Sequence, residues 1–439
     1  MKYTQIWKIT YPILLTLLAQ NLIQVIDTAF LGHVGEVELG ASAIAGIYYI
    51  AIFTIAFGFS NGSQILIGRR NGEGNYHKIG EIVVFGAVFL WVMALLIFLC
   101  TQAFSGAILG RLLSSEKVLK ASLEYLDWRI WGLFFATTNV MFRAFFVGIT
   151  RTKVLTFNAI IMALANVFFD YVLIFGHWGF PAMGIGGAAI ASVISEVVSV
   201  VFFLIYMACA VDLKKYGFTG IVWTHLQVIR NILNVSFSLM IQYFLSLSTW
   251  LIFFLAIERM GETTLAISNI IRSFYMIIGI PVFALASTAN TLVSNIIGAG
   301  KQDEVMPLIW KIVRMAILIS SVFVLFLALF PELSLSIYTS DPELIRESIP
   351  SLYVILGVLM VLSVGNVFFQ SVSGTGNTRS ALLIEVTTLV LYVLWMGFVV
   401  FYLQASLAVC WTTELIYAFF IGLFSFIYFK KGNWKNKKI

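Results

Sequence analysis

The feature of the 439-residue sequence that most constrains its fold is a series of twelve long apolar stretches. They fall at about 7–31, 39–67, 81–103, 122–147, 154–176, 184–211, 232–257, 265–296, 307–330, 349–373, 380–403 and 405–429. A helix needs about 20 mostly apolar residues to cross a bilayer, and lipid requires backbone polar groups to be satisfied within the protein. The strict alternation of a membrane barrel is absent. The sequence therefore predicts an all-α integral membrane protein with twelve transmembrane helices.

The composition excludes a water-soluble fold. The residues A, V, I, L, M, F, W, Y and C make up 60% of the chain and charged residues only 11%, whereas soluble proteins carry roughly 25% charged residues. The net charge of +6 is interpreted as loop bias rather than as affinity for nucleic acid. Three scattered cysteines without a Cys-x-x-Cys pair predict neither a disulfide framework nor a metal cluster.

The distribution of Lys and Arg predicts how the chain crosses the membrane. With both termini and every even-numbered connection placed inside, most of the 27 Lys and Arg residues fall on that side, as the positive-inside rule requires. The exception is the connection at about 104–121, which puts Arg111, Lys117 and Lys120 outside. We expect a multi-pass protein of the cell (inner) membrane with both termini cytoplasmic and with its first span retained rather than cleaved as a signal peptide.

The second half of the chain repeats the first. At an offset of 226 residues, Gly35-Glu36-x-x-Leu39 returns as Gly261-Glu262-x-x-Leu265, and Gly72-x-Gly74 returns as Gly298-x-Gly300. Gly148-x-Thr150-Arg151 is matched to Gly376-x-Thr378-Arg379 at an offset of 228. The repeat predicts two pseudo-symmetric six-helix lobes, a plan typical of secondary transporters. The expected divisions are a lobe at 1–211, a cytoplasmic linker at 212–230, a lobe at 231–429 and a basic cytoplasmic tail at 430–439. Convergence of short loops is the alternative.

Enzymatic chemistry is not indicated. The chain has no Gly-x-x-x-x-Gly-Lys-[Ser/Thr] loop for nucleotide phosphates. Gly58-Phe59-Ser60-Asn61-Gly62 has the letters of a hydrolase nucleophile elbow, but that motif needs a strand-to-helix turn, and here it lies inside a span. We therefore expect neither an enzyme nor a resident cofactor.

Polar residues in spans 1 and 5 predict an ion site. Gln20, Gln24 and Asp27 follow an i, i+4, i+7 spacing on one helical face, and Asn166 and Asp170 lie one turn apart. Both spans run outward, so the two aspartates lie at similar depth and are expected to face each other. Because two such carboxylates cannot both stay ionised at low cost, either one holds a proton or a cation sits between them. The alternative is a structural hydrogen-bonded pair.

Other polar groups within spans are costly to insert and are further candidates. Glu196 is expected to join the first-lobe site or to pair with a neighbouring hydroxyl. Glu414 lies in the middle of span 12, whereas Glu385 lies near the cytoplasmic end of span 11, where its side chain can reach the interface. Arg272 is expected to balance an acid or to touch substrate. Candidates for a substrate cavity are Gln24, Gln242, Asn366, Gln370, Arg272, Glu196 and Glu414.

At these residues the chain resembles the multidrug and toxic compound extrusion (MATE) family over nearly its whole length. The resemblance rests on Pro12, Val25-Ile26-Asp27-Thr28, Arg69-Arg70-x-Gly72-x-Gly74, the stretch from Arg143 to Arg151 and, most specifically, Asn166 to Gly176 followed by Gly179 to Ala189. It implies a twelve-helix antiporter that exports drugs against sodium or protons.

The resemblance also implies functional residues. The family's first-lobe ion site carries over onto Asp27, Asn166 and Asp170, and less closely onto Ala188 and Ser192. Gln20, a further candidate for this site, matches a polar position on span 1. Pro12 matches the proline at which the first helix bends in some members. It is a hinge candidate, unless it only marks the first turn of span 1, where proline is tolerated. Acids that some members carry in spans 7 and 10 correspond here to Ser246 and the region 363–366, so a second-lobe cation site of that type is not expected.

The sequence thus predicts a secondary active multidrug efflux antiporter that alternates access and is coupled to sodium or protons. Its abundant aromatic residues would suit small, amphipathic, cationic drugs, and we expect a monomer. The alternative is a lipid-linked oligosaccharide or lipid flippase of a related fold. A flippase is expected to have a more cationic cavity, whereas the charges within these spans are mainly acidic.

Overall fold

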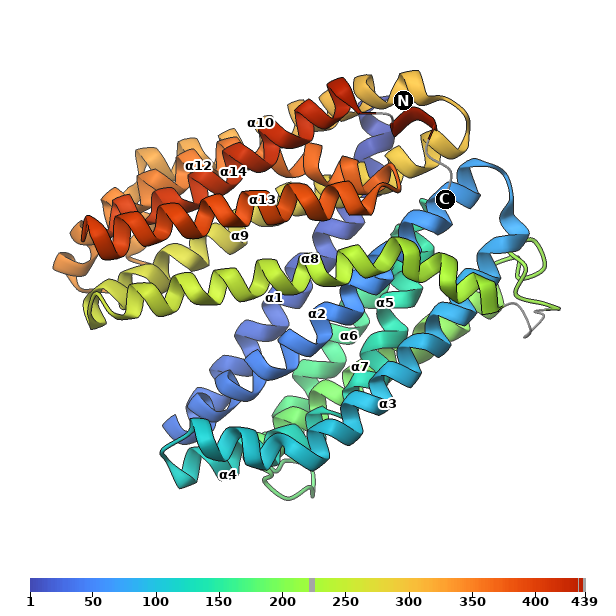
Figure 1. The fold of residues 1–439 in the computed structure, drawn as a ribbon. Coiled ribbons are helices and arrows are strands. Elements are labelled where there is room, and N and C mark those ends of the chain that lie inside the picture. Colours follow the sequence, from blue (N-terminus) through green and yellow to red (C-terminus); the bar gives the residue numbers. More distant parts are fainter. Residues whose placement is uncertain (221–225, 433, 437–439) are drawn as a thin grey trace. The chain divides into compact units, whose positions relative to one another are not determined.

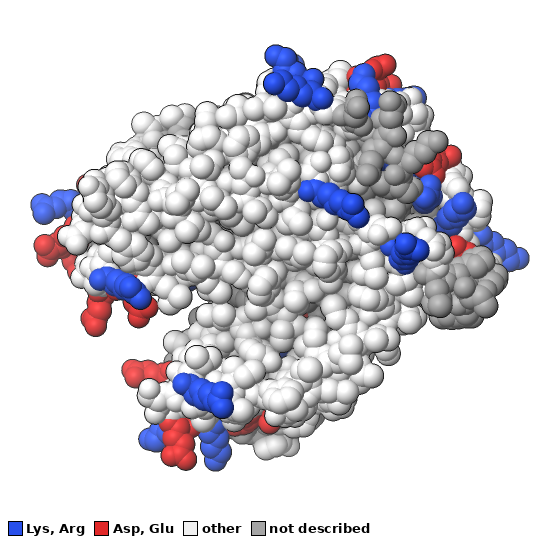
Figure 2. Space-filling model, viewed as in Figure 1, with Lys and Arg blue, Asp and Glu red and all other residues white. Residues whose placement is uncertain are grey.

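The computed structural model describes residues 1–220, 226–432 and 434–436, and its regular secondary structure there is helical throughout (Figure 1). Among the described residues, eleven helices are long and apolar enough to span a membrane, and one bent pair counted as a single span makes twelve. On the face that Figure 2 shows, most charged side chains lie toward the periphery and uncharged residues cover the broad surface between them. These observations confirm the twelve-span prediction.

The helices follow the expected order, with one span divided in two. The first half contains α1 (Tyr3–Val34), α2 (Glu36–Gly72), α3 (Ile79–Leu112), α4 (Glu116–Arg129), α5 (Gly132–Gly148), α6 (Lys153–Phe175) and α7 (Gly184–Ala210). The second half contains α8 (Leu226–Glu258), α9 (Glu262–Gly298), α10 (Val305–Leu329), the short α11 (Pro331–Leu335), α12 (Pro342–Gly374), α13 (Thr378–Gly397) and α14 (Leu407–Lys431).

The chain forms two compact units. The first unit is Leu15–Met240, and the second unit is Met1–Leu14 together with Ile241–Ile439. Two stretches are thus grouped differently from the expected lobes: residues 1–14 belong with the second half and residues 231–240 with the first. In the first unit α7 packs against α4, α5 and α6, and in the second unit α12 packs against α9, α10 and α14. Residues 221–225 of the expected linker and 433 and 437–439 of the expected tail lie outside the described residues.

Helix boundaries show the internal repeat directly. α2 and α9 each have 37 residues and begin 226 positions apart, at Glu36 and Glu262. α5 and α12 end at Gly148 and Gly374, again 226 apart, and each is followed two residues later by a positive φ. The helix ends therefore keep the offset of 226, so that Gly148 and Thr150 correspond in structure to Gly374 and Gly376, although the letters also match at 228.

The fourth span differs most from its expected form. It is bent by 51° between α4 and α5, and the break falls directly before Gly132, a residue type at which helices commonly kink. α4 begins at Glu116, so the connection expected at about 104–121 shrinks to residues 113–115. The expectation was wrong because α4 carries charged residues and has no long apolar run to reveal it.

The Gly58–Gly62 segment, which has the letters of a nucleophile elbow, is a packing surface of α2. A Cβ on Gly58 would lie 2.7 Å from Cα of Met240, and one on Gly62 would lie 2.6 Å from Cα of Ser236. The Ser236 hydroxyl donates to the Phe59 carbonyl at 3.0 Å. The two glycines therefore let the α2 and α8 backbones approach closely, as small residues do between membrane helices.

We expect Gly62→Val to destabilise the protein by about 1–3 kcal/mol, because the added atoms force the α8 backbone away. Gly40→Ala, in the same helix with no atom within 4 Å of its Cβ position, is the matched control. It should be neutral or stabilise by up to ~1 kcal/mol. Unfolding in detergent micelles measures both, and equal stabilities would contradict the packing account.

Candidate functional site

The first unit contains a polar cavity of about 440 Å³, walled by α1, α2, α4, α5, α6 and α7. Its polar lining residues are Thr16, Gln20, Gln24, Asp27, Tyr49, Tyr125, Arg129, Asn139, Arg143, Asn158, Asn166, Ser192, Ser195, Glu196 and Ser199. Polar and ionisable side chains inside a membrane-spanning unit are costly and mark functional sites by default. Six sequence candidates meet at this cavity: Gln20, Gln24, Asp27, Asn166, Ser192 and Glu196.

Asp27, Asn166 and Asp170 form one hydrogen-bonded group at the cavity wall. The Asp27 side chain lies within hydrogen-bonding reach of Asp170. Asp27 is half-buried, whereas Asn166 and Asp170 are fully buried behind it. With its NH2 group turned toward the carboxyls, Asn166 donates to Oδ1 of Asp27 at 3.0 Å and to Oδ2 of Asp170 at 3.2 Å. Helical spacing and the common outward direction of spans 1 and 5 lead to this meeting.

The geometry of this group suits a proton or a small cation. A hydrogen bond between two carboxyl groups requires a proton on one of them. Oδ1 of Asp170 is buried and has no hydrogen-bond partner among the described residues, which is unusual for a buried oxygen. If the Asn166 amide turns its carbonyl oxygen inward, three side chains present oxygen atoms to one point, the donor set that hard cations prefer. The same residues thus fit either ligand.

The other first-lobe candidates differ in their surroundings. Gln20, Gln24 and Ser192 line the cavity, from α1 and α7. Ala188 does not belong to this lining. It is buried in an apolar cluster with Leu31, Ala41, Ala121, Ile174 and Ile185. The correspondence of Ala188 with an ion site is therefore not supported by its environment.

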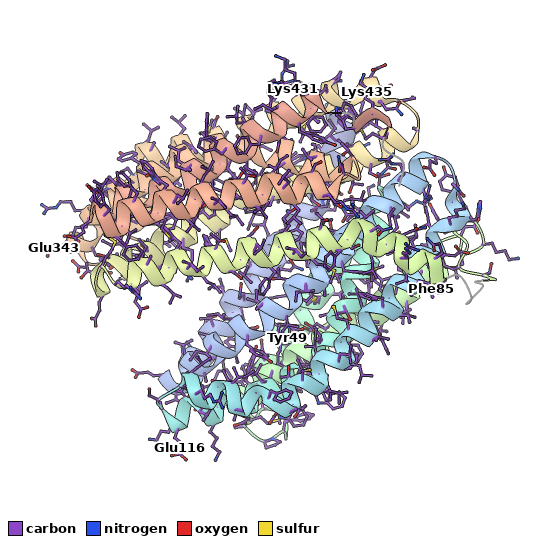
Figure 3. The ribbon with its side chains drawn as sticks, viewed as in Figure 1. Tyr49, Phe85, Glu116, Glu343, Lys431 and Lys435 are labelled. Carbon is purple, nitrogen blue, oxygen red and sulfur yellow. The ribbon has the colours of Figure 1, made fainter. Side chains whose placement is uncertain are left out.

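Glu196 pairs with a base rather than with a hydroxyl. Arg129 makes two hydrogen bonds to its carboxylate, at 2.7 and 3.1 Å, and the pair is almost fully buried. The Arg129 guanidinium also lies 3.9 Å from the ring centre of Tyr49 on α2, labelled in Figure 3, a cation–π contact. Glu196 thus lines the cavity as an ion-paired residue. Of the two alternatives expected for Glu196, the hydroxyl partner was wrong. The sequence signal for the correct partner was the position of Arg129 within the span at about 122–147.

The break in the fourth span makes room for this ion pair. Arg129 is the last residue of α4, and Gly132 is the first of α5. A Cβ on Gly132 would collide with the Arg129 guanidinium and the Glu196 carboxylate. Asn139 on α5 donates to the Glu196 carbonyl at 3.1 Å. α4 and α5 are therefore both joined to α7 at Glu196.

The remaining sequence candidates belong to the second unit. Gln242 is buried, and its Oε1 has no hydrogen-bond partner among the described residues. Asn366 and Gln370 are half-buried one turn apart on α12, and Gln370 accepts from Asn290. The Arg272 guanidinium lies 5.2 Å from the ring centre of Phe254, and no described acid forms a salt bridge with it. None of these residues lines the first-unit cavity.

Two acids within the spans of the second unit, Glu414 and Glu385, are both buried against hydroxyl groups. Glu414 accepts from the Tyr392 hydroxyl at 2.9 Å. Glu385 is fully buried and accepts from Tyr417 at 3.1 Å and from Ser246. The expectation that Glu385 reaches the membrane interface was wrong, because its side chain points inward against α8 and α14. A carboxylate therefore lies against Ser246, where the sequence showed only a serine.

We expect Glu385→Ala and Glu414→Ala each to destabilise the protein by about 2–4 kcal/mol, because each leaves buried hydroxyl groups without an acceptor. Glu385→Gln and Glu414→Gln keep an acceptor oxygen and should cost less than about 1 kcal/mol. Thermal unfolding in detergent compares the four variants. A Glu385→Ala protein as stable as Glu385→Gln would show that this carboxyl does not hold Ser246 and Tyr417.

Comparison with known proteins identifies the family. The MatE family model matches two segments, residues 12–172 and 235–399, which fall in successive halves of the repeat. The chain is 25% identical over 436 residues to the probable multidrug resistance protein NorM of Thermotoga maritima, covering 98% of this chain and 93% of that protein. It is 30% identical over 208 residues to the probable multidrug resistance protein NorM of Agrobacterium fabrum, covering 47% and 44%.

Solved structures agree in fold. An aspartate-to-asparagine variant of the Vibrio cholerae MATE transporter VcmN matches with a TM-score of 0.88 at 18% identity, over 99% of this chain and 98% of that one. The chain belongs to the MATE family of multidrug efflux transporters, as its sequence predicted, and it is a multi-pass membrane protein whose family transports small molecules.

Proposed function

We propose that this chain exports amphipathic, cationic small molecules by antiport against protons or sodium ions, with Asp27, Asn166 and Asp170 as the coupling site. The observation that carries the proposal is the contact between the half-buried Asp27 carboxyl and the fully buried Asp170 carboxyl. The two share Asn166, and Oδ1 of Asp170 has no hydrogen-bond partner among the described residues. Such a pair releases or binds a positive charge when its surroundings change.

Coupling requires that ion and substrate favour different conformations, because a ligand shifts an equilibrium only by its differential affinity for the two states. Asp27 faces the first-unit cavity, so a proton or sodium ion can reach it from there. Loss of that ion would leave two carboxylates in contact, a high-energy arrangement that a cationic substrate or a changed helix packing relieves. Gln20, Gln24 and Ser192 are the polar groups placed to assist in this cavity. In the second unit we assign Gln242, Asn366, Gln370, Arg272 and Glu414 as substrate contacts.

Efflux from proteoliposomes tests the proposal directly. The purified chain is reconstituted with a fluorescent cationic dye inside, and a proton gradient and a sodium gradient are imposed in separate experiments. One gradient should drive dye export and the other should not, which also identifies the ion. Dye export that is as fast without any gradient as with one would overturn the antiport proposal.

We propose further that both termini face the cytoplasm and that the chain acts as a monomer. Met1 and the last described residues of the chain share one end of the second unit: Lys311 donates to the Met1 carbonyl at 2.9 Å, and Lys435 pairs with Asp303 at 2.7 Å. Termini on one side agree with an even number of spans. The excess of Lys and Arg at that side supports its cytoplasmic assignment.

A lipid or lipid-linked oligosaccharide flippase is retained as the second candidate, because the cavity is less acidic than the sequence indicated. Arg129 and Arg143 both line it, beside Asp27 and Glu196, so bases match acids in number. Cationic groups would favour a phosphate-bearing substrate. The same proteoliposomes, loaded with a labelled anionic lipid, discriminate the two functions: flipping without dye export would favour the flippase.

We propose that Pro12 is a hinge of α1. α1 begins at Tyr3, so Pro12 is well inside the helix, and its assignment to the first turn is wrong. The division between the two units falls two residues later, between Leu14 and Leu15. In the second unit the Thr10 hydroxyl donates a hydrogen bond to the Thr288 hydroxyl at 3.0 Å. In the first unit the Thr16 hydroxyl donates to the Leu155 carbonyl at 3.4 Å. The helix is therefore held on both sides of a proline, which weakens it locally.

We expect Pro12→Ala to leave substrate binding near normal and to slow turnover severalfold, because the restored helix resists bending. Dye binding and dye export are measured on the same purified variant. Unchanged turnover would remove Pro12 from the mechanism.

A further inference from the structure

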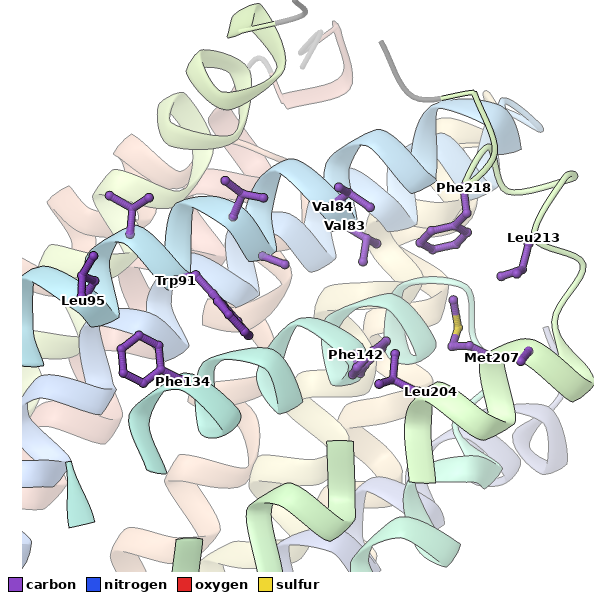
Figure 4. A pocket seen from close by; sticks show the side chains of 14 residues that line it. Val83, Val84, Trp91, Leu95, Phe134, Phe142, Leu204, Met207, Leu213 and Phe218 are labelled. Atoms are coloured by element: carbon purple, nitrogen blue, oxygen red, sulfur yellow. The ribbon is translucent and has the colours of Figure 1, made fainter. Parts of the chain in front are cut away.

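A second cavity of the first unit, separate from the polar one, lies among exposed apolar side chains. It is a groove of about 720 Å³ between α3, α5 and α7, and all of its lining side chains are apolar (Figure 4). Trp91, Leu95, Phe142 and Leu204 line its length, and Leu213 and Phe218 lie at one end. Specific small-molecule sites need a few oriented polar groups, which this lining lacks. The groove suits a flexible hydrocarbon chain.

The end of the groove is closed by residues 211–218, here called the strap. The Gly80 N–H at the start of α3 donates to the Tyr216 carbonyl at 2.7 Å. A Cβ on Gly80 would lie 2.6 Å from the Gly217 carbonyl carbon, so glycine is required for this close approach. The Tyr216 and Phe218 rings pack edge-on against Phe145, at 5.4 and 5.5 Å between ring centres. The strap is thus a fixed part of the groove.

The strap places positive charge beside its apolar end. Lys214 and Lys215 are exposed and directly follow the groove residue Leu213. The Lys215 ammonium lies 4.4 Å from the ring centre of Tyr76, which positions it. Two further bases are nearby. Lys78 directly precedes α3, and Arg151 interacts electrostatically with Tyr216. The acids on these segments are Asp212, whose carboxylate accepts from the Lys215 N–H at 3.0 Å, and Glu81. Bases outnumber acids.

We propose that this groove is a binding site for an anionic phospholipid, with one acyl chain along α3, α5 and α7 and the phosphate head group at Lys214 and Lys215. The apolar groove matches the acyl chain of such a lipid, and the bases at its end match the anionic head group. Basic residues at a membrane surface attract anionic lipids, each contributing a roughly fivefold gain in affinity. The site does not depend on ion coupling, so it can fail or hold independently of the proposed antiport.

Native mass spectrometry of the full chain tests the site. The protein is reconstituted in vesicles of equal phosphatidylglycerol and phosphatidylcholine, extracted, and scored for retained lipid. We expect wild type to retain phosphatidylglycerol preferentially. Lys214→Gln together with Lys215→Gln should reduce that preference roughly 30-fold, the combined effect of two charges. Ala87→Trp, which fills the groove, should lower retention of the bound lipid itself.

Ala103→Trp is the matched control, because Ala103 is exposed on the same helix but does not line the groove. Thermal unfolding confirms that each variant is folded. Equal retention of both lipids by wild type, or equal retention by Ala87→Trp and Ala103→Trp, would overturn the proposal. A dimer that forms without lipid and is lost in Ala87→Trp would overturn it too, by assigning the groove to a second copy of the chain.

Discussion

Asp27→Asn and Asp170→Asn are each expected to reduce gradient-driven efflux to the level of empty vesicles, while the protein still inserts and folds. Each change replaces a carboxyl group, which can exchange a proton or bind a cation through its negative charge, by a neutral amide. The size of the side chain stays nearly unchanged. An ion shifts the conformational equilibrium only by binding one conformation more tightly than the other. Without ion binding at this site, the ion gradient therefore cannot drive transport. Transport into and out of proteoliposomes measures the loss.

Asp127→Asn is the matched control for both variants. Asp127 lies on α4 in the same unit, but its side chain is exposed, and its replacement should leave efflux unchanged. Wild-type efflux rates in both Asp27→Asn and Asp170→Asn, under either gradient, would show that the first-unit carboxyls do not couple transport.

Arg129→Met should destabilise the protein by about 3–5 kcal/mol, because it leaves the Glu196 carboxylate buried without its counter-charge. The substitution also removes the cation–π contact with Tyr49 and the two hydrogen bonds to the Glu196 carboxylate on α7. Chemical unfolding in detergent measures the difference, with Arg111→Met, at an exposed position on α3, as the control for loss of an arginine.

The double variant Arg129→Met with Glu196→Met separates the charge from the shape of these residues. Replacing a buried ion pair by apolar groups of similar volume is often neutral or stabilising, so the double variant should recover most of the lost stability. If it is no more stable than Arg129→Met alone, Arg129 acts through packing rather than through its pairing with Glu196.

The spans and the first-unit acids were predictable from the sequence for the same reason. The bilayer requires long apolar helices, and helical periodicity then fixes which side chains share a face. Asp27, Asn166 and Asp170 could therefore be brought together from spacing and direction alone. The first residues of α4 were not predicted as part of a span, because this helix carries charged residues instead of a long apolar run.

Contacts that depend on how neighbouring helices turn could not be predicted. Arg129 meets Glu196 only because the fourth span breaks before Gly132 and turns the end of α4 toward α7. Glu385 lies near the start of its span in sequence, yet its side chain faces inward to Ser246 and Tyr417. Sequence position gives the depth of a residue along a helix but not which neighbour it faces, and Ala188 illustrates the same limit.

The most direct test of the central claim is to count the ions released when substrate binds to the purified protein. A cationic substrate is added to the detergent-solubilised chain in weak buffer with a pH indicator, and in parallel after loading with radioactive sodium. Wild type should release either protons or sodium in proportion to bound substrate, and Asp27→Asn should bind substrate without that release. Equal ion release by Asp27→Asn and wild type would contradict the assignment of Asp27, Asn166 and Asp170 as the coupling site.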